Sequence, residues 1–290
     1  MDSTGISRKL AEIKDLPSLP VVAQRVLQII QNPKSSAMVV AKAISLDEAL
    51  TTEVLRTANS AYFGFPRKIN TITHAIVLLG FAHIKNMVLT ATIVDMFQFE
   101  GTHDGFDRRR FWKHSLACAI TAELIARSQG MQNLEEVFIC GLLHDIGRLV
   151  MDINFNAEFT EAIALAREEE CLLLDAEKKV MGLNHPKLGG LVANKWNLGL
   201  TLTRAIKFHH KPLRAGEFSR TVSIVHLADA LCHAVGIGSS NDDKVPCLER
   251  EAWEQMGFDR QNLKHLFTEM EHKLAVAQDF LPNGKKTTRE

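Results

Sequence analysis

The 290-residue sequence has no excess of charge of either sign, because 34 Lys and Arg residues balance 34 Asp and Glu residues. A balanced chain has no overall positive field to attract nucleic acid, so no nucleic-acid partner is expected. The one dense basic run, Arg108–Arg110 with Lys113, is typical of the solvated start of a helix. The pattern therefore favours other classes of ligand.

Cysteine is scarce, and its spacing excludes the usual redox and zinc motifs. The five cysteines are an odd number at wide intervals, with no C-x-x-C pair, and suit small core residues in a reducing compartment. The N-terminus carries charges where a signal peptide needs an apolar stretch. No later run approaches the roughly 18 uncharged residues of a membrane span. We expect a cytoplasmic protein with no membrane contact.

Strand patterning is also missing, since no alternation of period two is sustained anywhere in the chain. Helical spacing is common instead, as in Val22, Val26 and Ile29, which recur after a serine and a proline suited to a helix start. The hydrophobic content of 46% over this length is ample for a buried core. The sequence therefore predicts an all-α fold.

A short polar segment with glycine at both ends, Gly101–Gly105, is the best candidate for an internal linker. We expect an N-terminal helical subdomain over residues 1–105 and a second helical subdomain over residues 106–281. Residues 282–290 are expected to form a flexible tail, and Gly236–Pro246 an exposed loop.

Polar side chains lie on apolar helix faces at several places in the second subdomain. His144 and Asp145 lie on interior faces of what reads as one continuous helix. A buried carboxylate without a partner is too costly to keep ionised, so Asp145 needs a cation, a proton or several donors. The small residues Gly141 and Gly147 are expected to leave room beside the two side chains.

Polar side chains on apolar helix faces recur along the rest of the subdomain. The full set of candidates is His114, His144, Asp145, His185, His209, His210 and Asp229. Taken singly, each is more often a hydrogen-bonded core residue or a cap. Together they favour a metal pocket, because imidazole nitrogen with carboxylate oxygen suits iron, manganese or zinc. Two such ions would polarise a phosphoryl oxygen and generate hydroxide near neutral pH.

This ordered set, with His-Asp-Ile-Gly at His144–Gly147, resembles the HD superfamily of metal-dependent phosphohydrolases, in the branch related to the HD-GYP enzymes. The resemblance implies a mononuclear or dinuclear centre of iron, manganese, zinc, nickel or magnesium, held by the seven candidate ligands. In an active member, His144, Asp145 and Arg148 would be the catalytic residues.

Four motifs in the first hundred residues point to a narrower family within this superfamily. They are Leu16-Pro17-x-Leu19-Pro20, Leu55-Arg56-x-x-Asn59-Ser60-Ala61-Tyr62, Ile69-x-Thr71 and Ala75-Ile76-x-x-Leu79-Gly80. They resemble the HDOD domain, the HD-related output domain of bacterial signalling proteins, and the match extends to Asp229. The resemblance implies an HD-superfamily-like multi-helix domain preceded by an N-terminal helical bundle. From its residue types, we interpret Asn59 as ending a helix and fixing a turn.

Two departures bear on activity. After His209-His210 the chain reads Lys211-Pro212-Leu213-Arg214, without the Gly-Tyr-Pro loop that accompanies cyclic di-GMP hydrolysis, which argues against that substrate. Arg148 stands where catalytic relatives often carry lysine. Our first hypothesis is a signal-transduction module that acts through a protein partner or ligand. The alternative is an active metal-dependent phosphohydrolase on a nucleotide or phosphodiester.

Overall fold

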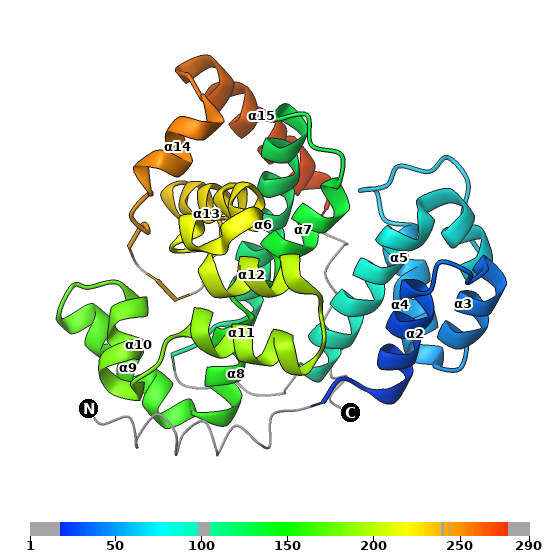
Figure 1. Ribbon diagram of the computed structural model, residues 1–290, viewed down its shortest axis with the longest axis horizontal. Helices are drawn as coiled ribbons and strands as arrows, with labels where there is room; N and C mark the ends of the chain where they lie inside the picture. Colours follow the sequence, from blue (N-terminus) through cyan, green and yellow to red (C-terminus); the bar gives the residue numbers. More distant parts are fainter. Residues whose placement is uncertain (1–17, 98–104, 239–240, 243, 278–290) are drawn as a thin grey trace, which may run out of the picture. The chain divides into compact units, whose positions relative to one another are not determined.

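The computed structural model describes residues 18–97, 105–238, 241–242 and 244–277. Within these residues the chain is helical and has no strand (Figure 1), so the all-α prediction is confirmed. Residues 98–104, with most of the predicted linker, and the predicted tail 282–290 lie outside the described residues, as do Leu16 and Pro17.

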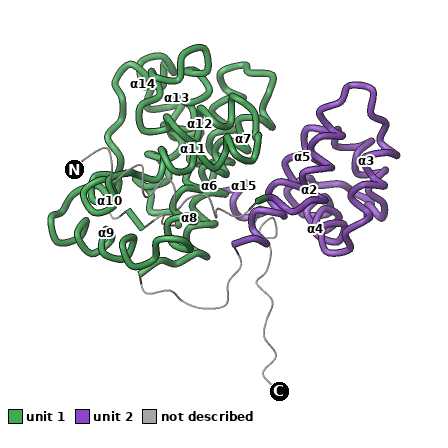
Figure 2. The backbone as a smooth tube through the Cα atoms, turned by 60° about the horizontal axis from the view of Figure 1, so that its bottom comes forward, with its two compact units in different colours: residues 1–18, 101–270 green, residues 19–100, 271–290 purple. Residues whose placement is uncertain are grey.

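The chain divides into two compact units (Figure 2). Unit 1 comprises Met1–Ser18 and Gly101–Met270, and unit 2 comprises Leu19–Glu100 and Glu271–Glu290. Because residues 98–104 are not described, a subdomain boundary near Gly101–Gly105 stays a proposal.

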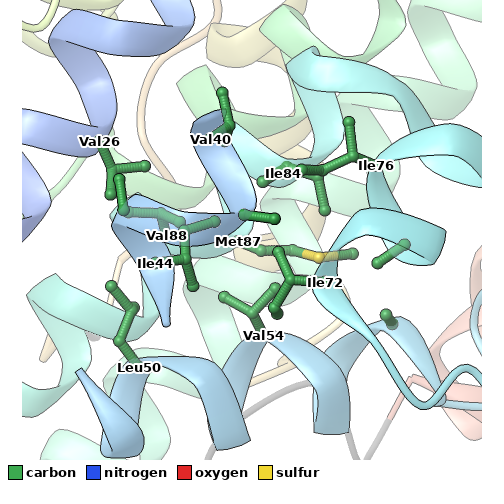
Figure 3. Close-up of a cluster of buried hydrophobic side chains, with 14 of the residues drawn as sticks. Val26, Val40, Ile44, Leu50, Val54, Ile72, Ile76, Ile84, Met87 and Val88 are labelled. Atoms are coloured by element: carbon green, nitrogen blue, oxygen red, sulfur yellow. The ribbon is translucent and has the colours of Figure 1, made fainter. Parts of the chain in front are cut away.

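Unit 2 is built from four helices whose long member packs against each of the others. The helices are α2 (Val21–Gln31), α3 (Ala37–Ile44), α4 (Glu48–Ala58) and α5 (Ile72–Met96). Their starts follow ordinary capping rules, since Ser36, Asp47 and Thr71 each accept a hydrogen bond from a backbone amide of the first turn. All four contribute branched side chains to one apolar core (Figure 3). Each buried side chain contributes about 1.5–3 kcal/mol.

Helix α5 joins two apolar segments that are separated by a break at Gly80. Gly80, with φ 81° and ψ 167°, interrupts the helix between them, a conformation that favours glycine. Despite Lys85, an 18-residue window of α5 reaches a mean hydropathy of 1.6, so its length and composition would allow a membrane span. In the structure 44% of that window is buried, and Ile76, Ile84 and Val88 belong to the core of unit 2.

Asn59 ends α4 and fixes the chain that follows, which agrees with its interpretation from sequence. Its side-chain amide donates to the carbonyls of Leu55, at 2.7 Å, and Ile69, at 2.8 Å, and its oxygen accepts from the Ile69 amide at 2.7 Å. Three bonds from one side chain thus connect the end of α4 to the segment before α5.

Unit 1 is arranged around α6, a helix that is buried along most of its length and packs mainly against α7 and α13. The elements from α6 onward are α6 (Arg108–Ser128), α7 (Leu134–Leu143), α8 (Ile146–Asn154), α9 (Asn156–Glu168), α10 (Leu173–Met181), α11 (His185–Lys195), α12 (Leu200–Phe208), η2 (Pro212–Phe218), α13 (Ser219–Ala234), α14 (Arg250–Met256) and α15 (Arg260–Val276). Helix α15 starts in unit 1, and its residues from Glu271 on belong to unit 2.

Two glycines of unit 1 allow helices to approach closely, and the prediction that they leave room beside the site was wrong. A Cβ at Gly141 would lie 2.8 Å from the Cα of Ala119 on α6. A Cβ at Gly147 would lie 2.1 Å from the carbonyl oxygen of His185, so α8 packs directly on the start of α11. The two glycines therefore allow the helices that carry the candidate metal ligands to pack closely.

Candidate metal centre

His144 and Asp145 lie in the turn between two helices. Helix α7 ends at Leu143 and α8 begins at Ile146, and Asp145 has φ −97° and ψ 12°, outside the helical region. The prediction of one continuous helix through both residues was therefore wrong. Both side chains are nevertheless buried, as their apolar surroundings in the sequence indicated.

The structure brings all seven predicted ligands together. Six of them are at most 2% exposed, and His210 is half-buried. They form two groups within which the ligand atoms lie no more than 4.8 Å apart. Group 1 is His114, Cys118, His144 and Asp229, and group 2 is Asp145, His185, His209 and His210. Cys118 is the one member that the sequence analysis treated as an ordinary core residue.

The donor atoms of group 2 are spaced as the ligands of one metal ion would be. The Asp145 Oδ1 atom lies 3.0 Å from His185 Nε2 and 3.4 Å from His209 Nε2. His185 Nε2 in turn lies 3.2 Å from the Nε2 atoms of both His209 and His210. Metal–ligand bonds of about 2.0–2.2 Å place neighbouring ligand atoms roughly 3.0–3.5 Å apart, which matches these distances.

Hydrogen bonds on the far side of three of the rings, His144, His185 and His209, aim Nε2 at the centre of the cluster. The Nδ1 atoms of His144 and His209 lie 2.7 Å and 2.9 Å from the carbonyls of Gly141 and Ile206, and each donates to its carbonyl. His185 Nδ1 lies 2.8 Å from a carboxylate oxygen of Glu177 and donates to it in the same way. A carbonyl or carboxylate only accepts, so Nε2 is the atom left to take a proton or a metal.

Two buried atoms of the cluster have no hydrogen-bond partner, namely His144 Nε2 and Asp145 Oδ1. Leaving such groups unsatisfied away from water costs about 1–3 kcal/mol each. His144 Nε2 lies 3.6 Å from Asp145 Oδ2 and 3.6 Å from Asp229 Oδ1, too far for hydrogen bonds. His144 belongs to group 1 and Asp145 to group 2, so a cation in each group would satisfy these atoms, and the residues present fit metal ions.

Arg148 neutralises the carboxylates behind the ligands. Its guanidinium donates to Asp145 Oδ2 at 3.0 Å and to Asp242 Oδ2 at 3.2 Å, and lies 3.4 Å from Glu177 Oε1. The guanidinium is 1% exposed, so this charge compensation takes place away from water. Arg148 was predicted as catalytic only for an active enzyme, and its contacts in the structure are with acidic side chains and His185.

Glu177 and Asp242 support the cluster, and the sequence analysis missed both. Glu177 is fully buried and accepts from the backbone amide of His185 at 2.8 Å as well as from its ring. Asp242 is 7% exposed, so the prediction of an exposed loop over Gly236–Pro246 was wrong at this position. Glu177 lies among lysines on a short amphipathic helix, and no local signal distinguishes it from a surface residue.

The pKa shifts favour positive charge at two histidines of the cluster and neutrality at two others. Burial and the Arg148 charge oppose ionisation of His185, but the carboxylates of Glu177 and Asp145 raise its pKa above the ordinary value. Burial opposes ionisation, but the carboxylate of Asp145 and its neighbours raise the pKa of His144 to about 9. Burial also opposes ionisation of Asp145, yet Arg148 and then His144 lower its pKa well below the ordinary range. Burial lowers the pKa of His209 to about 4 and lowers that of His210 well below its ordinary value.

Two further histidines of α13, His226 and His233, flank Asp229 in the sequence and differ in their contacts. His233 Nε2 lies 3.4 Å from Asp229 Oδ1, so this ring adjoins the carboxylate. His226 Nε2 instead accepts a hydrogen bond from the backbone amide of Glu249 at 2.9 Å. His226 Nε2 is therefore bonded to the chain just before α14.

The fold and the clustered side chains define a class, an all-helical protein with a buried histidine and aspartate cluster that could hold metal. The sequence model of the HDOD domain matches residues 16–212, most of the chain. The chain belongs to the HDOD domain family, and the resemblance predicted from its motifs is confirmed.

Relatives are similar over nearly the whole chain. A solved HDOD domain protein of unknown function from Geobacter sulfurreducens is 26% identical, with a TM-score of 0.80, over 96% of this chain and 98% of that one. A solved protein of Shewanella amazonensis SB2B, described as a candidate phosphohydrolase, is 26% identical with a TM-score of 0.72, over 93% and 97%.

An uncharacterized protein of Treponema pallidum (strain Nichols) is 26% identical over 230 residues, which are 78% of this chain. The match covers 44% of that protein, so the chain spans less than half the length of this curated relative.

Proposed function

We propose that this protein is a regulatory HDOD module of bacterial signal transduction whose HD-like half binds one or two metal ions. The observation that carries the proposal is the convergence of the His144, His185 and His209 Nε2 atoms on Asp145, with every Nδ1 atom fixed by an acceptor. Rings anchored in this way are the usual support of metal-binding histidines.

Burial of the cluster favours a regulatory over a catalytic role. The ligands other than His210 are at most 2% exposed, which leaves little access for a phosphoester. Asp145 Oδ2 is held by Arg148, so this oxygen is less available to bridge two ions. A cavity of ≈ 280 Å³ is lined by Ala166, Arg167, Glu170, Cys171, Asn241 and Lys244, none of which belongs to the cluster.

We propose that the signal is passed on through a protein partner, or through a nucleotide or phosphoester ligand that binds the module. The helical surface offers exposed apolar side chains that suit a protein contact, among them Met38, Val77 and Leu200. The five free cysteines suit a reducing compartment, and we propose the bacterial cytoplasm as the location.

A metal-dependent phosphohydrolase is the second candidate. The observation in its favour is the completeness of the two ligand groups, and one relative is described as a candidate phosphohydrolase. Bound ions would polarise a phosphoryl oxygen and lower the pKa of a bound water. Group 1 and group 2 would hold them, while Arg148 would keep Asp145 ionised and oriented.

Elemental analysis of protein purified without chelator tests the metal, and a panel of nucleotides and phosphodiesters tests turnover. We expect about one or two transition-metal ions per chain and no turnover. Asp145→Ala should lose the metal, whereas Asp175→Ala, at an exposed position of α10, should keep it. Turnover that requires Asp145 would replace the regulatory proposal with the enzyme, and a chain that retains no metal would refute both.

A further inference from the structure

We infer that Cys118 is a thiolate ligand of group 1, which gives the two halves of the centre different metal preferences. The inference rests on the proposed metal binding and deepens it by assigning a fourth donor to one half. The sequence analysis placed Cys118 among ordinary core residues. Its position on the helix that carries His114 indicates that it is also a donor to the metal.

Helix geometry places the thiol beside the first histidine of the cluster. Cys118 follows His114 by four residues on α6, so both side chains project from the same face one turn apart. The Cys118 Sγ atom lies 3.4 Å from His114 Nε2, and both residues are fully buried. The sulfur therefore reaches the same nitrogen that faces Asp229.

The four donors of group 1 have the spacing of a tetrahedral site. His114 Nε2 lies 3.1 Å from Asp229 Oδ1, which lies 3.6 Å from His144 Nε2. Bonds of about 2.0–2.3 Å to nitrogen, oxygen and sulfur put the corners of a tetrahedron roughly 3.3–3.7 Å apart. The three measured separations fall close to that range, with the His114–Asp229 pair slightly shorter.

An independent observation shows that group 1 needs a ligand. His144 is fully buried, and its Nε2 atom has no hydrogen-bond partner although Nδ1 is held by the Gly141 carbonyl. A ring nitrogen of His144 lies within 4.8 Å of the Cys118 sulfur, as do donor atoms of the other two residues of the group. A cation surrounded by the four atoms would satisfy His144 Nε2.

The protonation of the thiol is consistent with ligation. Burial, and then the neighbouring thiol of Cys232, raise the pKa of Cys118 well above its ordinary value, so without metal the side chain is a neutral thiol. A bound metal displaces the thiol proton, because the sulfur–metal bond replaces the sulfur–hydrogen bond and the proton is released to the solvent. The sulfur then adds a second negative charge to a group that otherwise has only Asp229.

The consequence is an asymmetric centre. Group 1 offers two imidazoles, a carboxylate and a thiolate, a set that selects zinc or cobalt. Group 2 offers three imidazoles and a carboxylate, which suits iron or manganese equally well. Zinc and cobalt should therefore enter group 1 first.

Cys232 provides a matched control. It is fully buried on α13, the helix that carries Asp229, and its sulfur lies 3.5 Å from the hydroxyl of Thr121. It lies beside Cys118 but outside both ligand groups. A serine at either position changes a buried thiol to a hydroxyl of similar size, so the two variants differ chiefly in which sulfur is removed.

Cobalt titration of chelator-treated protein, with a phosphine reductant and without added thiols, tests the inference. The wild-type chain and Cys232→Ser should develop near-ultraviolet sulfur-to-cobalt charge-transfer absorption at the first equivalent. Cys118→Ser should lose this absorption and bind that equivalent at least about 10-fold more weakly. The same band in Cys118→Ser, or its loss in Cys232→Ser alone, would overturn the assignment.

X-ray absorption of the wild-type protein loaded with one equivalent of zinc needs no variant. We expect one sulfur neighbour at about 2.3 Å. Bound zinc with nitrogen and oxygen neighbours alone would overturn the thiolate and leave the proposed metal binding intact. Failure to bind either metal would overturn both.

Discussion

Arg148 donates a hydrogen bond to Asp145 Oδ2 across 3.0 Å from the first turn of α8, and both side chains are at most 2% exposed. The same guanidinium donates to Asp242, which lies 94 residues further along the chain, and approaches Glu177. One buried cation thus compensates three carboxylates that no single segment of sequence holds together. The stability of this network can be measured directly.

Arg148→Met should lower the free energy of unfolding of the metal-free protein by about 3–5 kcal/mol, because three buried carboxylates lose their partner. Arg148→Lys should cost less, since it keeps the charge but lacks the planar fork that reaches several acceptors. Urea denaturation measures both, with Arg214→Met at an exposed position of η2 as the control. A cost for Arg148→Met as small as that of the control would contradict the network.

Glu177→Gln should weaken metal binding by about 10–100-fold, because Glu177 fixes the His185 ring and strengthens its Nε2 as a ligand. The amide is similar in size and still accepts from the His185 backbone. Competition against a chromophoric chelator measures the affinity. Glu161→Gln, on the exposed face of α9, should leave the affinity unchanged, and an equal effect of the two substitutions would refute the role of Glu177.

Gly147→Ala should destabilise unit 1 by roughly 2–4 kcal/mol, since the new methyl would lie 2.1 Å from the carbonyl oxygen of His185 and force α8 away from α11. Gly190→Ala is the matched change on α11, where the methyl would meet the Lys207 side chain at 3.0 Å. The nearest atom there is the Cβ of Lys207, which has to give by only a few tenths of an ångström, so the cost of Gly190→Ala should be smaller, at about 1 kcal/mol. Thermal unfolding compares the two, and similar midpoints would argue against close backbone packing.

The metal-free protein should be most stable near pH 6.5. The folded pKa of His144, about 9, exceeds its ordinary 6.5, so its stabilisation is complete below pH 6.5 and is lost as pH rises through 9. His209, with a folded pKa of about 4, has its stabilisation above pH 6.5 and loses it as pH falls toward 4. Each contribution amounts to about 3 kcal/mol.

Urea denaturation of chelator-treated protein at pH 5, 6.5 and 8.5 measures this pH dependence. His144→Gln should reduce the loss of stability on the alkaline side, to which His185 also contributes, and leave the acidic side. A wild-type profile that rises steadily from pH 6.5 to 8.5 would show that His144 is neutral in the metal-free fold.

The sequence determined that the protein is helical and which buried histidines and aspartates are candidate metal ligands. Helical spacing places His114, His209 and Asp229 on apolar stripes, and the cost of burying such groups indicates that they meet a common partner. The turn after α4 was also readable, because the bonds that Asn59 makes are local. These features depend on residues close together in the chain.

Only the tertiary structure decided which donors meet. Periodicity tells which face of a helix is buried but not which other helix lies against it, so the pairing of Cys118 with His144 and Asp229 was out of reach. For the same reason, the sequence did not predict that Glu177 lies beside His185 or that Gly147 allows two helices to pack closely. The separation of the candidate ligands into two groups is set by side-chain packing across segments that are distant in sequence.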